Sequence, residues 1–193
     1  MQRKTLLIGI TAIVVFVAIS AARMFIASNQ SFRSEAIDPP APAVEISMTD
    51  QNGKPFRMSY LQGKVVLLYF GFVNCPEECP LTMAHLKLAL EMLGDRAADV
   101  QVVMVSTDPI RDTPQAMKTF LGKFNPGFLG ISGTSDELAK IWGDYGVEVL
   151  DGGETHSSFT YVIDRRGNQR LNFSPDSTPE DIVHDLNILL AEK

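Results

Sequence analysis

The sequence predicts an α/β sandwich in which helices flank a mixed central sheet. Two short apolar runs, at residues 64–70 and 100–106, are each followed by a segment with helical apolar spacing, which is typical of parallel strands joined by crossover helices. Two later apolar runs, at residues 159–163 and 169–173, flank a turn-rich segment that indicates an antiparallel hairpin. A chain of 193 residues, 45% of them hydrophobic, suits one globular domain plus a short extra segment.

The first half of the domain alternates strands with turns before the first long helix. Residues 44–48 alternate between apolar and polar side chains like a strand, and residues 56–58 complete a hairpin after the turn at 50–53. The continuous apolar run at 64–70 predicts a strand that is covered on both faces. Apolar residues at helical spacing predict a helix over residues 81–93.

Threonine caps mark the starts of three further helices. Thr113 and Thr178 each precede a proline, which suits the first helical position. Thr134 stands three residues before Glu137 and indicates a capping box. Residues 164–168, between the last two strands, predict a hairpin turn. The complete order of elements favours an α/β sandwich of the thioredoxin type.

The N-terminal segment is directed to a membrane. Residues 6–22 carry no charge, and Arg3 and Lys4 precede them. We expect residues 1–27 to form a transmembrane anchor that leaves the globular part outside the cytoplasm. A cleaved signal peptide is the alternative, because residues 18–20 form an acceptable small-x-small cleavage site.

A linker should separate this segment from the folded domain. Residues 28–43 are polar and contain three prolines between 38 and 42, so we expect an extended spacer, with the folded domain over residues 44–193. The chain carries a formal charge of −6, and its first 33 residues contain no acidic side chain, so the folded part is the acidic part. An acidic domain is a poor candidate for binding nucleic acid.

The chain contains two cysteines, Cys75 and Cys79, in the sequence Cys-Pro-Glu-Glu-Cys-Pro. Pro76 suits the first position of a helix, and a helix that begins there would place both sulfurs on one face. Two adjacent sulfurs can form a disulfide or bind a metal, and a helix N-terminus favours the thiolate form that both reactions use. Two inert buried cysteines are the alternative, which the spacing disfavours.

Four segments give the chain a resemblance to the Sco/SenC family, thioredoxin-like copper proteins that help to assemble the dinuclear copper centre of cytochrome c oxidase. These segments are residues 50–54 (DQNGK), 70–80 (FGFVNCPEECP), 106–114 (STDPIRDTP) and 155–164 (THSSFTYVID). The resemblance implies a copper ion held by Cys75, Cys79 and His156. Two thiolates and one imidazole form a soft ligand set that suits Cu(I) and can hold Cu(II).

The resemblance also implies partners and a location. We expect a metallochaperone rather than an enzyme, with the copper-bearing subunit of cytochrome c oxidase as recipient and a copper chaperone as possible donor. The expected location is a bacterial inner membrane, with the copper-binding domain facing the periplasm and the N-terminal helix in the bilayer.

Other functions use the same two sulfurs. In an extracytoplasmic thiol-disulfide oxidoreductase, Cys75 attacks a partner disulfide and Cys79 resolves the mixed disulfide, and this role is compatible with copper delivery. A peroxidase would oxidise one cysteine to a sulfenic acid and use the other to resolve it. Zinc also accepts two cysteines and one histidine. The resemblance, and not the ligand types, favours copper.

Five further residues have simpler interpretations. His85 lies six residues beyond Cys79 and cannot readily share its helix face, and His184 belongs to the last helix, where we expect it to be solvated. Met83 shares the face of Cys79, but a core position is expected for it. Asp108 and Asp112 are expected to act as turn and cap residues, and the alternative is that they neutralise or orient groups near the metal site.

Overall fold

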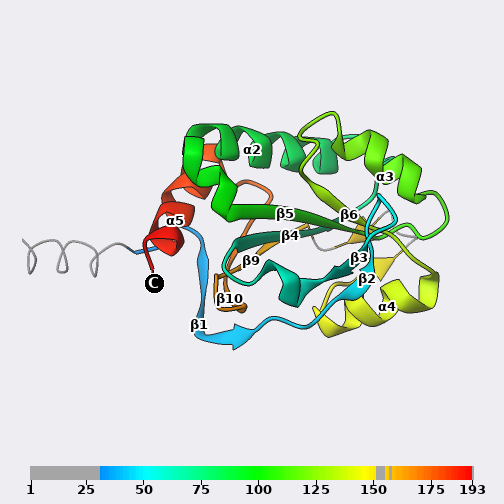
Figure 1. The fold of residues 1–193 in the computed structure, drawn as a ribbon, viewed down its shortest axis with the longest axis horizontal. Helices are drawn as coiled ribbons and strands as arrows, with labels where there is room; N and C mark the ends of the chain where they lie inside the picture. The colour runs from blue at the N-terminus through cyan, green and yellow to red at the C-terminus, as the bar shows by residue number, and fades with distance from the viewer. Residues whose placement is uncertain (1–30, 151–154, 157, 193) are drawn as a thin grey trace, which may run out of the picture. The chain divides into compact units, whose positions relative to one another are not determined.

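The structure is a computed structural model that describes residues 31–150, 155–156 and 158–192, and its folded unit begins at Arg33 (Figure 1). The expected membrane segment, residues 1–27, lies outside the described residues. Within the described part of the chain, no helix has both the length and the apolar composition that crossing a bilayer requires.

Six strands form one sheet in the order β1-β10-β9-β4-β5-β6. β4, β5 and β6 are parallel, whereas β9, β10 and β1 are added by antiparallel pairing. The predicted mixed sheet is therefore confirmed. Its strands are β1 (Glu35–Pro42), β4 (Val65–Gly71), β5 (Val100–Ser106), β6 (Leu129–Ile131), β9 (Thr160–Ile163) and β10 (Asn168–Phe173).

Helices cover both faces of this sheet, as predicted. α2 (Glu78–Leu93) packs against α5 (Pro179–Ala191), and α3 (Pro114–Leu121) packs against β6 on the same side (Figure 1). α4 (Ser135–Asp144) lies on the opposite side, where its buried side chains join the main hydrophobic cluster. The sheet is therefore the middle layer of a three-layer sandwich.

The three predicted threonine caps are present. Thr113, Thr134 and Thr178 each accept a hydrogen bond from the backbone N–H three residues later, and Thr134 completes a capping box with Glu137. These bonds satisfy N–H groups that have no partner inside the helix.

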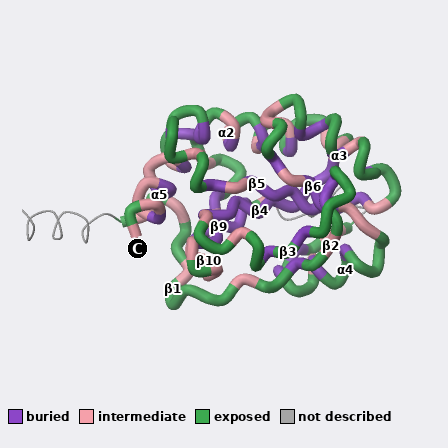
Figure 2. Tube along the Cα trace, viewed as in Figure 1, coloured by how far each residue is buried: buried purple, intermediate pink, exposed green. Residues whose placement is uncertain are grey.

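Every residue of β4 is buried, which confirms the interpretation of its continuous apolar run (Figure 2). β4 lies between β5 and β9, with Gly71 opposite Ser106 and Tyr69 opposite Thr160. Val66, Leu68 and Phe70 join the cluster on the α4 side. Because side chains alternate along a strand, Tyr69 faces α2.

Both predicted hairpins are present. β2 (Ser47–Thr49) pairs with β3 (Pro55–Arg57) in a separate two-stranded sheet. In the turn between β9 and β10, the Asp164 carboxylate accepts hydrogen bonds from the backbone N–H groups of Arg166 and Asn168, at 2.9 Å each. Asp164 thereby stabilises the turn that the sequence indicated.

The folded domain starts earlier than expected. We expected a linker over residues 28–43, but residues 35–42 form β1, an edge strand antiparallel to β10. The pairing is irregular between Ala36 and Ala41. Proline cannot donate to a strand ladder, but an edge strand tolerates it. The prolines therefore exclude a central strand but not an edge strand. The expected start of the folded domain at residue 44 is wrong.

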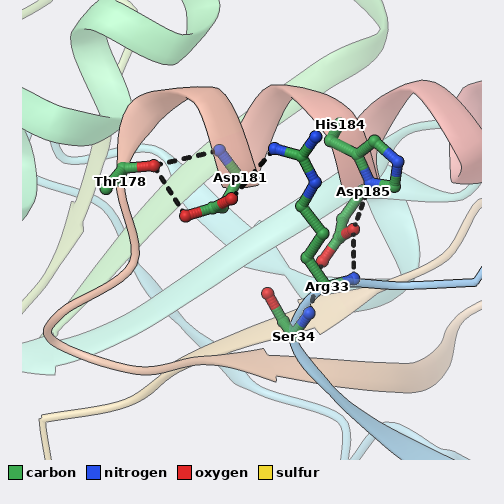
Figure 3. Close-up of polar contacts among 6 residues, drawn as sticks. All are labelled: Arg33, Ser34, Thr178, Asp181, His184 and Asp185. Atoms are coloured by element: carbon green, nitrogen blue, oxygen red, sulfur yellow. Dashed lines mark hydrogen bonds and ion pairs between the residues drawn. The ribbon is translucent and has the colours of Figure 1, made fainter.

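The chain enters β1 through hydrogen bonds to Asp185 in α5 (Figure 3). The backbone N–H groups of Arg33 and Ser34 donate to the two carboxylate oxygens of Asp185, at 2.8 and 2.9 Å. Asp185 is fully buried, and His184 Nδ1 lies 2.9 Å from the same carboxylate. The Arg33 guanidinium pairs with Asp181 at 3.0 Å. One buried side chain thus anchors the chain just before the edge strand, and the strand itself is held by its pairing with β10.

Replacing Asp185 with alanine should destabilise the fold. Asp185→Ala leaves two backbone N–H groups without their acceptor, and we expect the free energy of unfolding to fall by about 2–3 kcal/mol. Urea unfolding followed by circular dichroism measures the change. Glu91→Ala is the control, since it removes one partner of the exposed Lys87–Glu91 pair and should cost at most about 0.5 kcal/mol. Equal losses in the two variants would contradict the role of Asp185.

Candidate metal centre

Both cysteines lie where β4 ends and the chain turns into α2. Cys75 precedes the helix, which begins at Glu78, and Cys79 is the second helical residue. The sequence predicted a helix over residues 81–93 and allowed a start at Pro76, and the observed start lies between these two positions. Pro80 lies in the first turn of the observed helix. The N–H groups of the first turn have no partner inside the helix, so a proline, which lacks an N–H, is tolerated there.

The two cysteines are in direct contact. The backbone N–H of Cys79 donates to Cys75 Sγ at 3.3 Å, so the Cys75 sulfur caps the helix N-terminus. Both residues are free thiols, with Cys75 partly exposed and Cys79 fully buried. The structure therefore brings together the two sulfurs that the sequence singled out and gives them unequal access to solvent.

Tyr69 and Gly71 form the inner wall around Cys79. The Tyr69 hydroxyl donates to Cys79 Sγ at 3.4 Å, and both side chains are completely buried. A Cβ atom at Gly71 would lie 2.9 Å from Cys79 Sγ and 2.6 Å from Tyr69 Cε1, which is too close for any side chain. The sequence interpretation missed Tyr69. The available signal was a phenol, which needs a polar partner, inside a run of otherwise apolar residues.

Burial controls the ionisation of this inner pair. It raises the pKa of the Cys79 thiol to about 12, although hydrogen bonds from Tyr69 and from the Phe72 backbone act in the opposite direction. Burial also raises the pKa of the Tyr69 hydroxyl. We expected the helix N-terminus to favour thiolate, and for Cys79 this is wrong. A helix dipole contributes about 0.3–1 kcal/mol, which is less than the several kcal/mol for desolvating a buried charge.

A second loop, residues 107–112, braces the cysteine turn. Thr107 N–H donates to the Gly71 carbonyl at 2.9 Å. The buried Asp112 carboxylate accepts from the Val73 N–H at 3.1 Å and from the Ser106 hydroxyl at 2.6 Å. A turn or cap role was expected for Asp112, with orientation of groups near the site as the alternative, and its contact with the cysteine turn agrees with that alternative.

The same loop is held in shape by Asp108. Its carboxylate accepts from the backbone N–H groups of Ile110 and Arg111, at 3.2 and 3.1 Å, and pairs with the Arg111 guanidinium. The guanidinium carbon lies 5.9 Å from the centre of the Phe72 ring, within range of a cation–π contact. The expected turn role of Asp108 is confirmed.

The backbone of His156 lies at the same end of the sheet as the cysteines. His156 belongs to β8 (Thr155–His156), which pairs with β7 (Val149–Leu150). Thr160, four residues later, lies opposite Tyr69, near the end of β4. Four extended residues span at most about 14 Å. The side chain of His156 lies outside what the structure describes, and its role as a ligand stays a prediction.

The remaining candidates have structural partners. His85 Nδ1 lies 3.2 Å from the Ser177 carbonyl oxygen, and Met83 is fully buried, which confirms its core position. His184 is partly buried and contacts Asp185 instead of being solvated, so that expectation is wrong. Among the side chains that the structure describes, no group of three or more His, Cys, Asp or Glu residues could hold a metal.

Ionisation of Asp112 should make stability depend on pH. Burial raises the pKa of this carboxyl from 3.8 to about 6. The folded state therefore binds the proton more tightly than the unfolded state, so this contribution to stability is complete below about pH 4 and is lost as the pH rises through about 6. Asp112→Asn cannot ionise. Its free energy of unfolding, relative to the unchanged chain, should rise between pH 4 and pH 7.

Urea unfolding in copper-free buffer at each pH unit measures this difference. Asp136→Asn removes an exposed carboxylate at the start of α4 and controls for the loss of charge alone. A difference between the Asp112→Asn variant and the unchanged chain that does not vary with pH would contradict the assignment.

Known proteins are similar to this chain in sequence and in fold. The sequence model described as SCO1/SenC matches residues 36–191. The SCO2-like protein of Rickettsia conorii is 34% identical over 155 residues, which cover 74% of this chain and 74% of that protein. The structure of Bradyrhizobium japonicum ScoI with copper bound is 35% identical with a TM-score of 0.70, covering 77% of this chain and 99% of that one. Apo Sco1 from Thermus thermophilus is also 35% identical, with a TM-score of 0.73, and the match covers 83% of this chain and 98% of that one. This chain therefore belongs to the SCO1/SenC family.

Proposed function

We propose that this chain binds a copper ion through Cys75, Cys79 and His156 and delivers or prepares copper for the dinuclear centre of cytochrome c oxidase. The observation that carries this proposal is the contact between two reduced cysteines at the N-terminus of α2. The copper-bound structure of the related ScoI supports the choice of metal.

The chemistry of the donor set fits copper. Two thiolates and an imidazole are soft or borderline ligands, which suit Cu(I) and can also hold Cu(II). Because the pKa of Cys79 is raised to about 12, binding must displace a proton from this sulfur. The braced turn holds the two cysteines in contact before any metal arrives, so less ordering is needed on binding.

Unequal exposure suits a protein that gives its metal away. Cys79 is completely enclosed, whereas Cys75 is partly exposed at the turn. A thiolate of a recipient protein could reach and replace Cys75 first, while the buried Cys79 stays in place. This role requires ligand exchange and no catalytic turnover, so we propose a metallochaperone rather than an enzyme.

The same asymmetry favours thiol-disulfide exchange as a second function. The Cys75 thiolate would attack a partner disulfide, forming a mixed disulfide and releasing one partner thiolate. Cys79, after losing its proton, would then attack the Cys75 sulfur, which forms the Cys75–Cys79 bond and releases the second partner thiolate. The partner gains two electrons and leaves reduced, ready to accept metal.

The family and the N-terminal sequence support a proposal for the location and the partners. We propose that residues 1–27 anchor the chain in a bacterial inner membrane and that the folded domain faces the periplasm. The proposed recipient is the copper-bearing oxidase subunit, and a copper chaperone is the proposed donor. Finding the intact N-terminus on membrane-bound protein would support an anchor, and finding it removed would support a signal peptide.

Copper binding should depend on all three proposed ligands. We expect one Cu(I) per full-length reduced chain, and a loss of affinity of more than about 100-fold in His156→Ala and in Cys75→Ser. Loss of an outer-shell partner alone typically costs about 10–100-fold, and loss of a ligand should cost more. Titration against a chromogenic Cu(I) chelator measures the affinities.

His85→Ala is the matched control for the loss of a histidine, since His85 contacts the Ser177 carbonyl and not the cysteines. It should bind copper like the unchanged chain. The copper proposal would be contradicted if the chain bound copper weakly, with the same affinity in His156→Ala, and still reduced a disulfide. That result would favour the oxidoreductase.

A further inference from the structure

The Cys79 sulfur is surrounded by hydrogen-bond donors that come from the β4 side of the site. Tyr69 donates from its hydroxyl at 3.4 Å, and the backbone of Phe72 provides a second hydrogen bond. The Thr82 side chain, one turn into α2, hydrogen-bonds the same Tyr69 hydroxyl. Cys79 therefore accepts two donors although it is fully buried, whereas Cys75 accepts the backbone N–H of Cys79.

The Tyr69 ring is held by the central sheet. Its backbone pairs with Met104 of β5 on one side and with Thr160 of β9 on the other. Gly71 leaves the space in which the ring and the sulfur meet, since a Cβ there would overlap both. The central sheet therefore holds the Tyr69 hydroxyl beside the Cys79 sulfur, and no exposed loop is needed to position it.

A sulfur accepts a hydrogen bond more strongly as its negative charge increases. A thiolate, free or bound to a metal, is a better acceptor than a thiol, and a thiol is better than a disulfide sulfur. A fixed phenol donor therefore stabilises the reduced and metal-bound forms of Cys79 more than the disulfide form. Hydrogen bonds to a cysteine sulfur tune redox behaviour in copper sites for the same reason.

We propose that Tyr69 is a positioning residue for Cys79, whose phenol holds the buried sulfur and favours its reduced form over the Cys75–Cys79 disulfide. Forming that disulfide breaks two S–H bonds and releases two protons and two electrons. Oxidised glutathione takes them up and becomes two molecules of reduced glutathione. The phenol opposes this reaction, because the bond it makes to the sulfur weakens when the disulfide forms.

Tyr69→Phe tests the proposal, since it removes the hydroxyl and keeps the ring. The full-length, copper-free chain is equilibrated in buffers of reduced and oxidised glutathione, and thiols are trapped and counted. We expect the equilibrium constant for disulfide formation to rise about 3–10-fold, which corresponds to a potential about 14–30 mV lower. An unchanged constant, or a shift towards the dithiol, would overturn the proposal.

Tyr145→Phe is the matched control. The Tyr145 hydroxyl donates to the Val44 carbonyl at 2.7 Å, and its ring lies in the hydrophobic cluster on the α4 side of the sheet. This variant loses a mostly buried hydroxyl of the same kind and should unfold more easily, yet its glutathione equilibrium should stay within about twofold of the unchanged chain. An equal shift in both variants would show a general effect on stability and would overturn the proposal.

A second measurement tests the proposal without the Tyr69→Phe variant, in case that variant does not fold. Replacing the tyrosines of the otherwise unchanged chain with 3-fluorotyrosine makes each phenol a stronger donor, and the equilibrium should then shift towards the dithiol; a shift towards the disulfide would overturn the proposal. The inference concerns the same site as the proposed function, but the glutathione equilibrium contains no copper. A chain that fails to bind copper and still shows these shifts would contradict the proposed function and support the role of Tyr69.

Discussion

The parallel pairing of β4 with β5 is the constraint on which the site depends. This pairing sets Gly71 beside Ser106, so the two loops that follow leave the sheet side by side. Asp112 then joins the loops through the Val73 N–H, and Thr107 joins them through the Gly71 carbonyl. The cysteine turn is short and irregular. Without the loop at residues 107–112 beside it, the turn would have little internal structure to hold the two sulfurs in contact.

Burial of one sulfur and not the other gives the site its chemical character. Cys79 lies against Tyr69 in the interior, where desolvation disfavours the thiolate and raises the pKa of the thiol to about 12. Cys75 caps the helix and stays accessible. Under the proposed function, Cys79 would retain the copper or the disulfide bond, while Cys75 would exchange with partners. Copper delivery and thiol exchange both need one buried and one accessible cysteine, so the structure supports both proposals.

Much of the fold could be predicted from the sequence, because local signals agree with it. The long apolar runs of β4 and β5, the threonine caps and the Asp164 turn each depend on a few neighbouring residues. β1 could not be predicted, because its stability comes from pairing with a strand more than a hundred residues away and its prolines oppose a strand locally. β6, β7 and β8 are two or three residues long, too short for a periodic pattern.

For the site, the spacing of Cys75 and Cys79 was sufficient to predict that they meet. Tyr69 and Asp112 act through contacts with residues that only the folded sheet brings close, and Asp112 and Val73 are 39 positions apart.

The central claim is a site of two sulfurs and one imidazole. Copper K-edge X-ray absorption of the Cu(I)-loaded, full-length chain tests it most directly. The account predicts two sulfur scatterers and one imidazole nitrogen per copper, and a shell without imidazole, or with a single sulfur, would contradict it.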